Sequence, residues 1–182
     1  MAKRIAEIIV LAEDNNQAKF ARLYLERAGH DSRRIRVRPP AQGKGSGEQY
    51  VREHYTDEVR YYRNRSSHRT AALVVVTDAD TMIVGEREGK LKNALASAGQ
   101  NPRQPREAIA LFIPKRNIET WILCLTGERV NEKQDYADHG DIQPRIKPAA
   151  ETFHEWSRPN YQVPTHCVDS LRRGLSEVQR IP

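Results

Sequence analysis

The strongest constraint on the fold comes from residues 73–80, which read LVVVTDAD. Four consecutive apolar residues, three of them β-branched, predict a strand buried on both faces, as in a parallel sheet covered by helices. The stretch ends in two carboxylates one residue apart. Parallel sheets place their chemistry at the carboxyl ends of the strands, so Asp78 and Asp80 are well placed to hold a divalent cation. In the alternative interpretation, they turn the chain and cap the next helix.

Strand and helix patterns alternate along the first two thirds of the chain. Short apolar runs predict strands, and apolar residues at helical spacing follow each of them. Asn15 is expected to cap the first helix. This alternation predicts an α/β fold with right-handed crossovers, in which a mostly parallel, Rossmann-like sheet of about four strands is flanked by helices. We expect residues 1–127 to form this domain and residues 128–182 to form a helical extension packed on it. The predicted strands are residues 6–12, 33–38, 73–76 and 108–113.

The charge is distributed unevenly. The 182-residue chain has a net charge of +6, and residues 31–70 hold ten Arg or Lys against five acids. A basic segment of this kind suits a polyanionic partner, although charged strand faces are often only solvated edges. In the helix predicted over 48–65, Tyr55 and Tyr62 share a core spacing with Val51 and Val59, so we expect these two tyrosines to be buried. The candidate nucleic-acid-binding residues are Arg34, Arg36, Arg38, Lys44, Arg52, Arg60, Arg63 and Arg65.

Other features suggest where the protein works. The two cysteines, Cys124 and Cys167, are far apart and lack a C-x-x-C partner, which favours a reducing compartment. No apolar run approaches the roughly 20 residues of a membrane span, and the N-terminus lacks the apolar core of a signal peptide. We therefore expect a cytoplasmic protein without a membrane partner.

Acidic and basic residues follow the other predicted strands as well. Glu13 follows the first strand, and Lys115 and Glu119 follow the last. Since parallel strands end at one edge of the sheet, these residues are expected to meet Asp78 and Asp80 there and to form a metal and phosphate site. Lys115 and Glu119 lie four residues apart, and an ordinary surface pair on one helix is the alternative for them.

These residues, taken together in this order, resemble the Toprim family. Three features show this resemblance: a Glu after the first strand, the D-x-D after a central strand, and the segment IPKRNIETWIL at 113–123. The segment is similar to one in small stand-alone Toprim-like, RloB-like proteins of bacterial defence systems. OLD-type nucleases share the Toprim domain as well. The resemblance implies that Glu13 is a general base or metal ligand and that Asp78 and Asp80 bind Mg²⁺ or Mn²⁺. Lys115 would stabilise a phosphate, with Glu119 as a supporting acid.

The resemblance implies a divalent-metal-dependent nuclease that cleaves DNA or RNA, with a role in phage defence. Phosphodiester cleavage suits this residue set. The 64 residues between Glu13 and Asp78 exceed a minimal Toprim core, and the basic segment 31–70 within them is interpreted as an insertion that grips substrate.

Other functions were considered for the D-x-D motif. D-x-D-x-T phosphatases need Thr where this chain has Met82, and nucleotide-sugar transferases need a larger scaffold. A topoisomerase would need additional domains. The remaining alternative is a non-catalytic Toprim-like subunit that binds nucleic acid or a partner ATPase.

Overall fold

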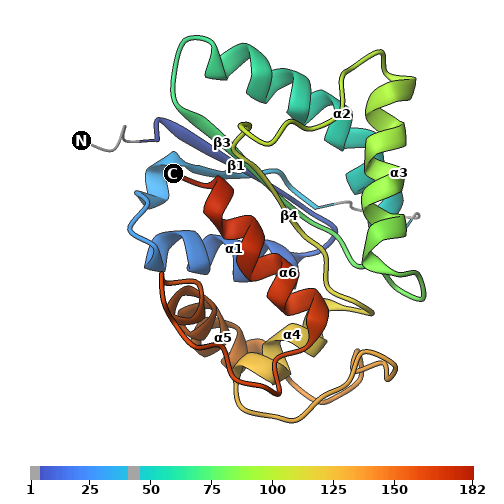
Figure 1. The fold of residues 1–182 in the computed structure, drawn as a ribbon, viewed down its shortest axis with the longest axis vertical. Helices are drawn as coiled ribbons and strands as arrows, with labels where there is room; N and C mark the ends of the chain where they lie inside the picture. The colour runs from blue at the N-terminus through green and yellow to red at the C-terminus, as the bar shows by residue number, and fades with distance from the viewer. Residues whose placement is uncertain (1–4, 41–45) are drawn as a thin grey trace.

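A four-stranded, all-parallel sheet forms the centre of the molecule (Figure 1). The computed structural model describes residues 5–40 and 46–182. The strand order is β2-β1-β3-β4, which confirms the predicted α/β class and the parallel sheet. The strands are β1 (Glu7–Ala12), β2 (Ile35–Val37), β3 (Ala71–Val76) and β4 (Ile109–Phe112).

Strands β1, β3 and β4 are buried on both faces because helices cover both sides of the sheet, whereas only Ile35 of the edge strand β2 is buried. All six residues of β3 are buried, as its unbroken apolar run predicts. Successive side chains point to opposite faces, so Val74 and Val76 belong to one core and Leu73 and Val75 to the other. Both cores are continuous with the helices that cover the respective face.

Helices α2 (Gly47–Ser66) and α3 (Val84–Ser97) pack on one face of the sheet, and the remaining helices pack on the other (Figure 1). In α2, Tyr55 and Tyr62 are buried, which confirms that these two tyrosines belong to the core. The second face is covered by α1 (Asn15–Arg27), α4 (Ile118–Leu125), α5 (Gln143–Trp156) and α6 (Asp169–Glu177). Short 3₁₀ turns occupy Ser32–Arg34 and Val178–Arg180.

The C-terminal helices pack on the sheet around Trp121. This side chain is fully buried and stacks on Phe153 of α5, with ring centroids 6.0 Å apart. Helix α6 approaches it so closely that a Cβ atom on Gly174 would lie 2.3 Å from the indole ring. Ser170 of α6 accepts a hydrogen bond from the indole N–H at 2.8 Å. The expected helical extension therefore contributes to the same core as the sheet.

Side chains cover the open edge of β4. The guanidinium of Arg103 donates to the carbonyl oxygen of Ile109 at 2.8 Å, and the Glu177 carboxylate accepts from the backbone N–H of Leu111 at 2.9 Å. Arg103 and Glu177 also form an ion pair. This pair takes the hydrogen-bonding place of a further strand, which leaves the edge less able to pair with another chain.

Within the part of the chain that the structure describes, no helix combines the length and the apolar character needed to cross a membrane.

Candidate functional site

The register of the parallel strands places Glu13 beside the D-x-D motif. Ala12 of β1 lies opposite Val76 of β3, so the next residues, Glu13 and Thr77, are neighbours. One Glu13 carboxylate oxygen accepts hydrogen bonds from the backbone N–H of Asp78, at 2.8 Å, and from the Thr77 hydroxyl. The Glu13 side chain thus links the ends of two adjacent strands.

Two further interactions fix the turn that carries Glu13. Its own backbone N–H donates to the buried Gln17 side chain at 3.0 Å. The next residue, Asp14, caps α1 by accepting from the Gln17 backbone N–H at 2.9 Å. The expectation that Asn15 forms this cap was wrong, because Asn15 is already the first helical residue. The first residue of α2, Gly47, packs closely on Glu13. A Cβ atom on Gly47 would lie 2.7 Å from the Glu13 Cβ.

Asp78 is the most deeply buried acid of the predicted set. It is 8% exposed, and its Oδ1 atom has no hydrogen-bond partner among the described residues. Burial raises its pKa well above the ordinary value, and the negative charges of Glu13 and Asp14 raise it further. A buried carboxylate oxygen without a donor is unfavourable. Oxygen atoms of this kind suit a hard divalent cation.

The environment of Glu13 also disfavours its negative charge. Burial raises its pKa to about 7, in spite of the hydrogen bonds from Thr77 and Asp78, which lower it. Glu13 and Asp78 are therefore neighbouring acids that both hold protons more tightly than free carboxyl groups. Burial likewise raises the pKa of Glu119 on α4, and the charges of Asp14 and Asp135 add to that effect.

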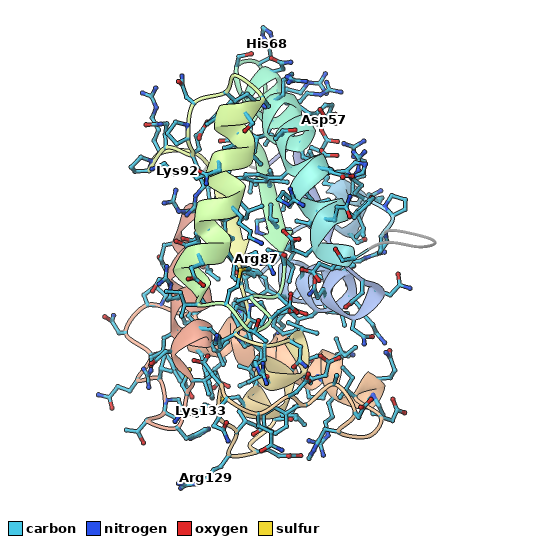
Figure 2. The ribbon with its side chains drawn as sticks, turned by 90° about the vertical axis from the view of Figure 1, so that its right-hand side faces the viewer. Asp57, His68, Arg87, Lys92, Arg129 and Lys133 are labelled. Carbon is cyan, nitrogen blue, oxygen red and sulfur yellow. The ribbon has the colours of Figure 1, made fainter. Side chains whose placement is uncertain are left out.

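Asp80 has a cationic partner that the sequence analysis did not identify. The guanidinium of Arg87, from the first turns of α3, donates to the Asp80 carboxylate at 2.9 Å and forms an ion pair with Glu48 at 2.7 Å. Arg87 is 2% exposed, and Figure 2 places it in the middle of the molecule. Asp80 has a left-handed backbone with φ of 52°, which ends the regular extended chain after β3.

Lys115 and Arg116 bring the chain after β4 to the same edge. The backbone N–H of Ala79 donates to Pro114 at 2.8 Å, and Asp80 forms an isolated bridge with Arg116. The Lys115 ammonium donates to the carbonyl oxygens of Thr81 and Met82. It therefore contacts the loop that follows the D-x-D motif.

The alternative interpretation, in which Lys115 and Glu119 form a surface pair on one helix, is excluded. Asn117 caps α4, which begins only at Ile118, so Lys115 lies before the helix. The Asn117 side chain accepts from the Thr120 N–H at 3.3 Å and donates to Asp135 at 2.6 Å. Glu119 remains in the first helical turn, on the side of Asp14.

Carboxylate oxygens are suitable ligands for a divalent cation, but the predicted acids do not form a complete coordination site. Across residues 5–40 and 46–182, no three Asp, Glu, His or Cys groups are placed to hold a metal ion together. Glu13 and Asp78 are the two adjacent acids, while Asp80 is held by Arg87. Mg²⁺ commonly uses one or two carboxylates with water and substrate phosphates as further ligands. Glu13 and Asp78 would supply such a pair.

The predicted basic residues divide into two groups. Four are paired with nearby acids: Arg63 with Glu107 at 2.7 Å, Arg52 with Glu48 at 3.2 Å, Arg60 with Asp57 at 3.4 Å, and Arg38 with Glu58. The other three, Arg34, Arg36 and Arg65, line one cavity at the amino ends of the strands. Lys44 lies outside the described residues. The strand expected to carry Arg34, Arg36 and Arg38 is shorter than predicted, so only Arg36 lies within β2.

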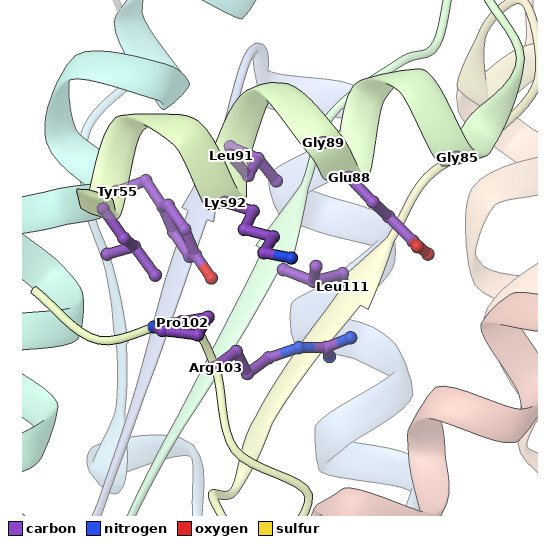
Figure 3. A pocket seen from close by; sticks show the side chains of 10 residues that line it. Tyr55, Gly85, Glu88, Gly89, Leu91, Lys92, Pro102, Arg103 and Leu111 are labelled. Carbon is purple, nitrogen blue, oxygen red and sulfur yellow. The ribbon is translucent and has the colours of Figure 1, made fainter. Parts of the chain in front are cut away.

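A different cavity lies between α3 and β4 (Figure 3). It has a volume of about 310 Å³, and its charged lining residues include Glu88, Lys92 and Arg103. Arg103 is already engaged with Glu177 at the β4 edge. The residues that line this cavity include no member of the predicted acidic site.

Comparison of the chain with protein-family models, with curated proteins and with solved structures gave no match.

Proposed function

We propose that this protein is a divalent-metal-dependent phosphodiesterase of the Toprim type, which cleaves nucleic acid at the edge formed by Glu13, Asp78 and Asp80. The observation that carries the proposal is the buried Asp78 carboxylate, whose Oδ1 atom lacks a partner in the described structure, beside the half-buried Glu13. Burying an acid without a counterion destabilises a protein, so a bound cation gives this arrangement a physical reason.

Each residue has a role in this proposal. Glu13 and Asp78 would hold Mg²⁺ or Mn²⁺, which would neutralise the phosphodiester oxygens and lower the pKa of water. Burial raises the pKa of Glu13 to about 7 in the metal-free protein, so a cation that binds near neutral pH would have to displace this proton. Arg87 neutralises Asp80. Lys115 holds the loop after Asp80, and Glu119 adds negative charge from α4.

One observation favours the non-catalytic alternative. Arg87 already forms ion pairs with both Asp80 and Glu48, so a cation would have to compete for Asp80. A protein that uses this edge only as a structural network, and that binds nucleic acid or a partner ATPase through its basic side, would show the same pairing.

Metal binding and cleavage can be measured separately on the full chain. Thermal unfolding is followed with EDTA and with Mn²⁺, and supercoiled DNA and structured RNA are incubated with the same samples. We expect Mn²⁺ to raise the melting temperature, with a stabilisation of about 2.7 kcal/mol at 100 times the dissociation constant. Cleavage of at least one substrate should require Mn²⁺.

The matched variants are Asp78→Asn and Asp57→Asn. Asp78→Asn should abolish the Mn²⁺ effect and reduce cleavage by at least about 100-fold, since even residues that only orient a metal ligand contribute about 10–100-fold. Asp57 lies on the exposed side of α2, so its variant should behave like the native protein. Stabilisation by Mn²⁺ that persists in Asp78→Asn would contradict the proposed site. Absence of Mn²⁺-dependent cleavage from both substrates would favour the non-catalytic subunit.

A further inference from the structure

A second charged cavity lies at the opposite ends of the strands from Glu13 and Asp78. It has a volume of about 440 Å³, which is within the usual size range of ligand sites. Glu7 begins β1, Arg36 lies on β2, and Arg69 precedes β3, so the cavity opens at the amino ends of the sheet. We call it the arginine pocket; its charged lining residues are Glu7, Arg33, Arg34, Arg36, Arg65 and Arg69.

The arginine pocket has an excess of positive charge. Arg36 and Arg65 share the Glu7 carboxylate at 3.5 and 3.9 Å, and Arg36 lies 4.0 Å from Glu58. These contacts are longer than the 2.7 Å pair of Arg63 with its own acid outside the pocket. Weakly shared carboxylates leave guanidinium N–H groups able to bind a stronger anion.

The other arginines of the pocket add to this excess. Arg33 and Arg34 share Asp31, at 3.2 and 3.9 Å. For Arg69, no carboxylate lies within ion-pair distance among the described residues, and the residue is exposed. Five guanidinium groups thus face three acids, of which Glu58 has its closest pair with Arg38 outside the pocket.

Tyr61 of α2 holds two of the guanidinium groups in place. Arg36 and Arg65 lie over its ring, 5.0 and 5.2 Å from the centroid. The Tyr61 hydroxyl donates to Glu7 at 3.1 Å and accepts from Arg65 at 2.9 Å. Because arginines already cover the ring, it offers little surface for base stacking. The pocket is therefore suited to recognise phosphate groups.

We propose that the arginine pocket is a second phosphate site, which holds neighbouring phosphate groups of a nucleic-acid backbone or of a free oligophosphate. The six-residue strands separate it from the carboxylates by about 20 Å. Figure 2 agrees, since His68, the neighbour of Arg69, lies at the top of the molecule and Arg87, the partner of Asp80, lies well below it. A single strand that reaches both sites needs about six nucleotides, at about 3.4 Å each.

The site is tested by metal-free binding to the full chain in EDTA. Inorganic pyrophosphate is titrated calorimetrically, and labelled single-stranded RNA of 4 and 12 nucleotides is measured by fluorescence anisotropy at several salt concentrations. Arg69→Gln is compared with Arg22→Gln, which removes the same charge from an exposed arginine of α1 that is neither in the pocket nor among the candidate nucleic-acid-binding residues. We expect Arg69→Gln to weaken binding roughly tenfold and to reduce the salt slope by about 1, with little effect of Arg22→Gln.

The ligands distinguish the two sources of phosphate. Binding of pyrophosphate that depends on Arg69 supports a free oligophosphate, and binding of RNA alone that depends on Arg69 supports a backbone. Failure of both ligands to bind, or equal weakening by Arg22→Gln, would overturn the proposal. Asp78→Asn should leave the binding of pyrophosphate unchanged, so the pocket and the proposed nuclease activity can fail independently.

Discussion

Glu13→Gln is expected to stabilise the metal-free protein above neutral pH. The native side chain is half-buried and accepts hydrogen bonds from the Asp78 N–H and the Thr77 hydroxyl through one oxygen. The amide oxygen of Gln can accept the same two bonds. The substitution removes only the negative charge, which burial makes unfavourable.

The size and sign of the effect follow from the pKa of Glu13. Folding raises this pKa from 4.5 to about 7, so between these values the folded protein binds more protons than the unfolded chain. The free energy of unfolding therefore falls as pH rises from about 4.5 to 7, by about 3 kcal/mol in total. The free energy of unfolding of the Glu13→Gln variant does not fall in this way as pH rises, because Gln does not titrate. For a chain of 182 residues, the gain at pH 8 corresponds to a melting temperature higher by about 6–12 °C.

Thermal and urea unfolding, followed by circular dichroism in EDTA at pH 4.5, 6 and 8, measure this difference. The gain should be small at pH 4.5 and should grow toward pH 8. Glu26→Gln is the control, because Glu26 forms an exposed ion pair with Arg22 and its loss should change stability by less than about 0.5 kcal/mol at every pH. A Glu13→Gln protein that is less stable than the native protein at pH 8, or equally stabilised at all three pH values, would refute the reasoning.

Two further predictions concern the packing of the C-terminal helices. Glu177→Ala should destabilise the protein by about 1–3 kcal/mol, because the Leu111 N–H at the sheet edge loses its acceptor. Glu177→Gln keeps an acceptor and should destabilise the protein less. Urea unfolding measures the loss of stability, and light scattering measures any edge-to-edge association. Gly174→Ala should destabilise the protein by about 1–3 kcal/mol, since the added methyl group overlaps Trp121 in the core. At Gly85 nothing lies within 4 Å of an added Cβ, so Gly85→Ala should stabilise the protein by about 0.5–1 kcal/mol in the same urea unfolding assay.

The sequence predicted the sheet well because its signals are local. The apolar run of β3 and the core spacing in α2 each depend on neighbouring residues, and both match the burial in the structure. The length of β2 was less predictable, since alternating Arg and apolar residues fit both a strand and a turn. The partners of the basic residues were not predictable at all, because Arg63 pairs with Glu107, 44 residues away, across the fold.

The sequence likewise predicted one part of the site, the position of its acids, but not the partner of Asp80. The proximity of Glu13 to Asp78 follows from parallel strands that end together, which the sequence pattern predicts. The burial of Arg87 was not predictable, because an arginine on a helix usually faces solvent and only the packing of α2 against α3 buries this one.

Arg87 neutralises one of the two acids of the D-x-D motif and not the other. Arg87 contacts Asp80 and leaves the Asp78 Oδ1 atom without a partner in the described structure, so one acid has a cation and the more buried acid lacks one. A buried acid without a partner lowers the stability of the fold, and acids with strongly shifted pKa values cluster at functional sites, which supports the proposed role of Asp78 as a cation ligand.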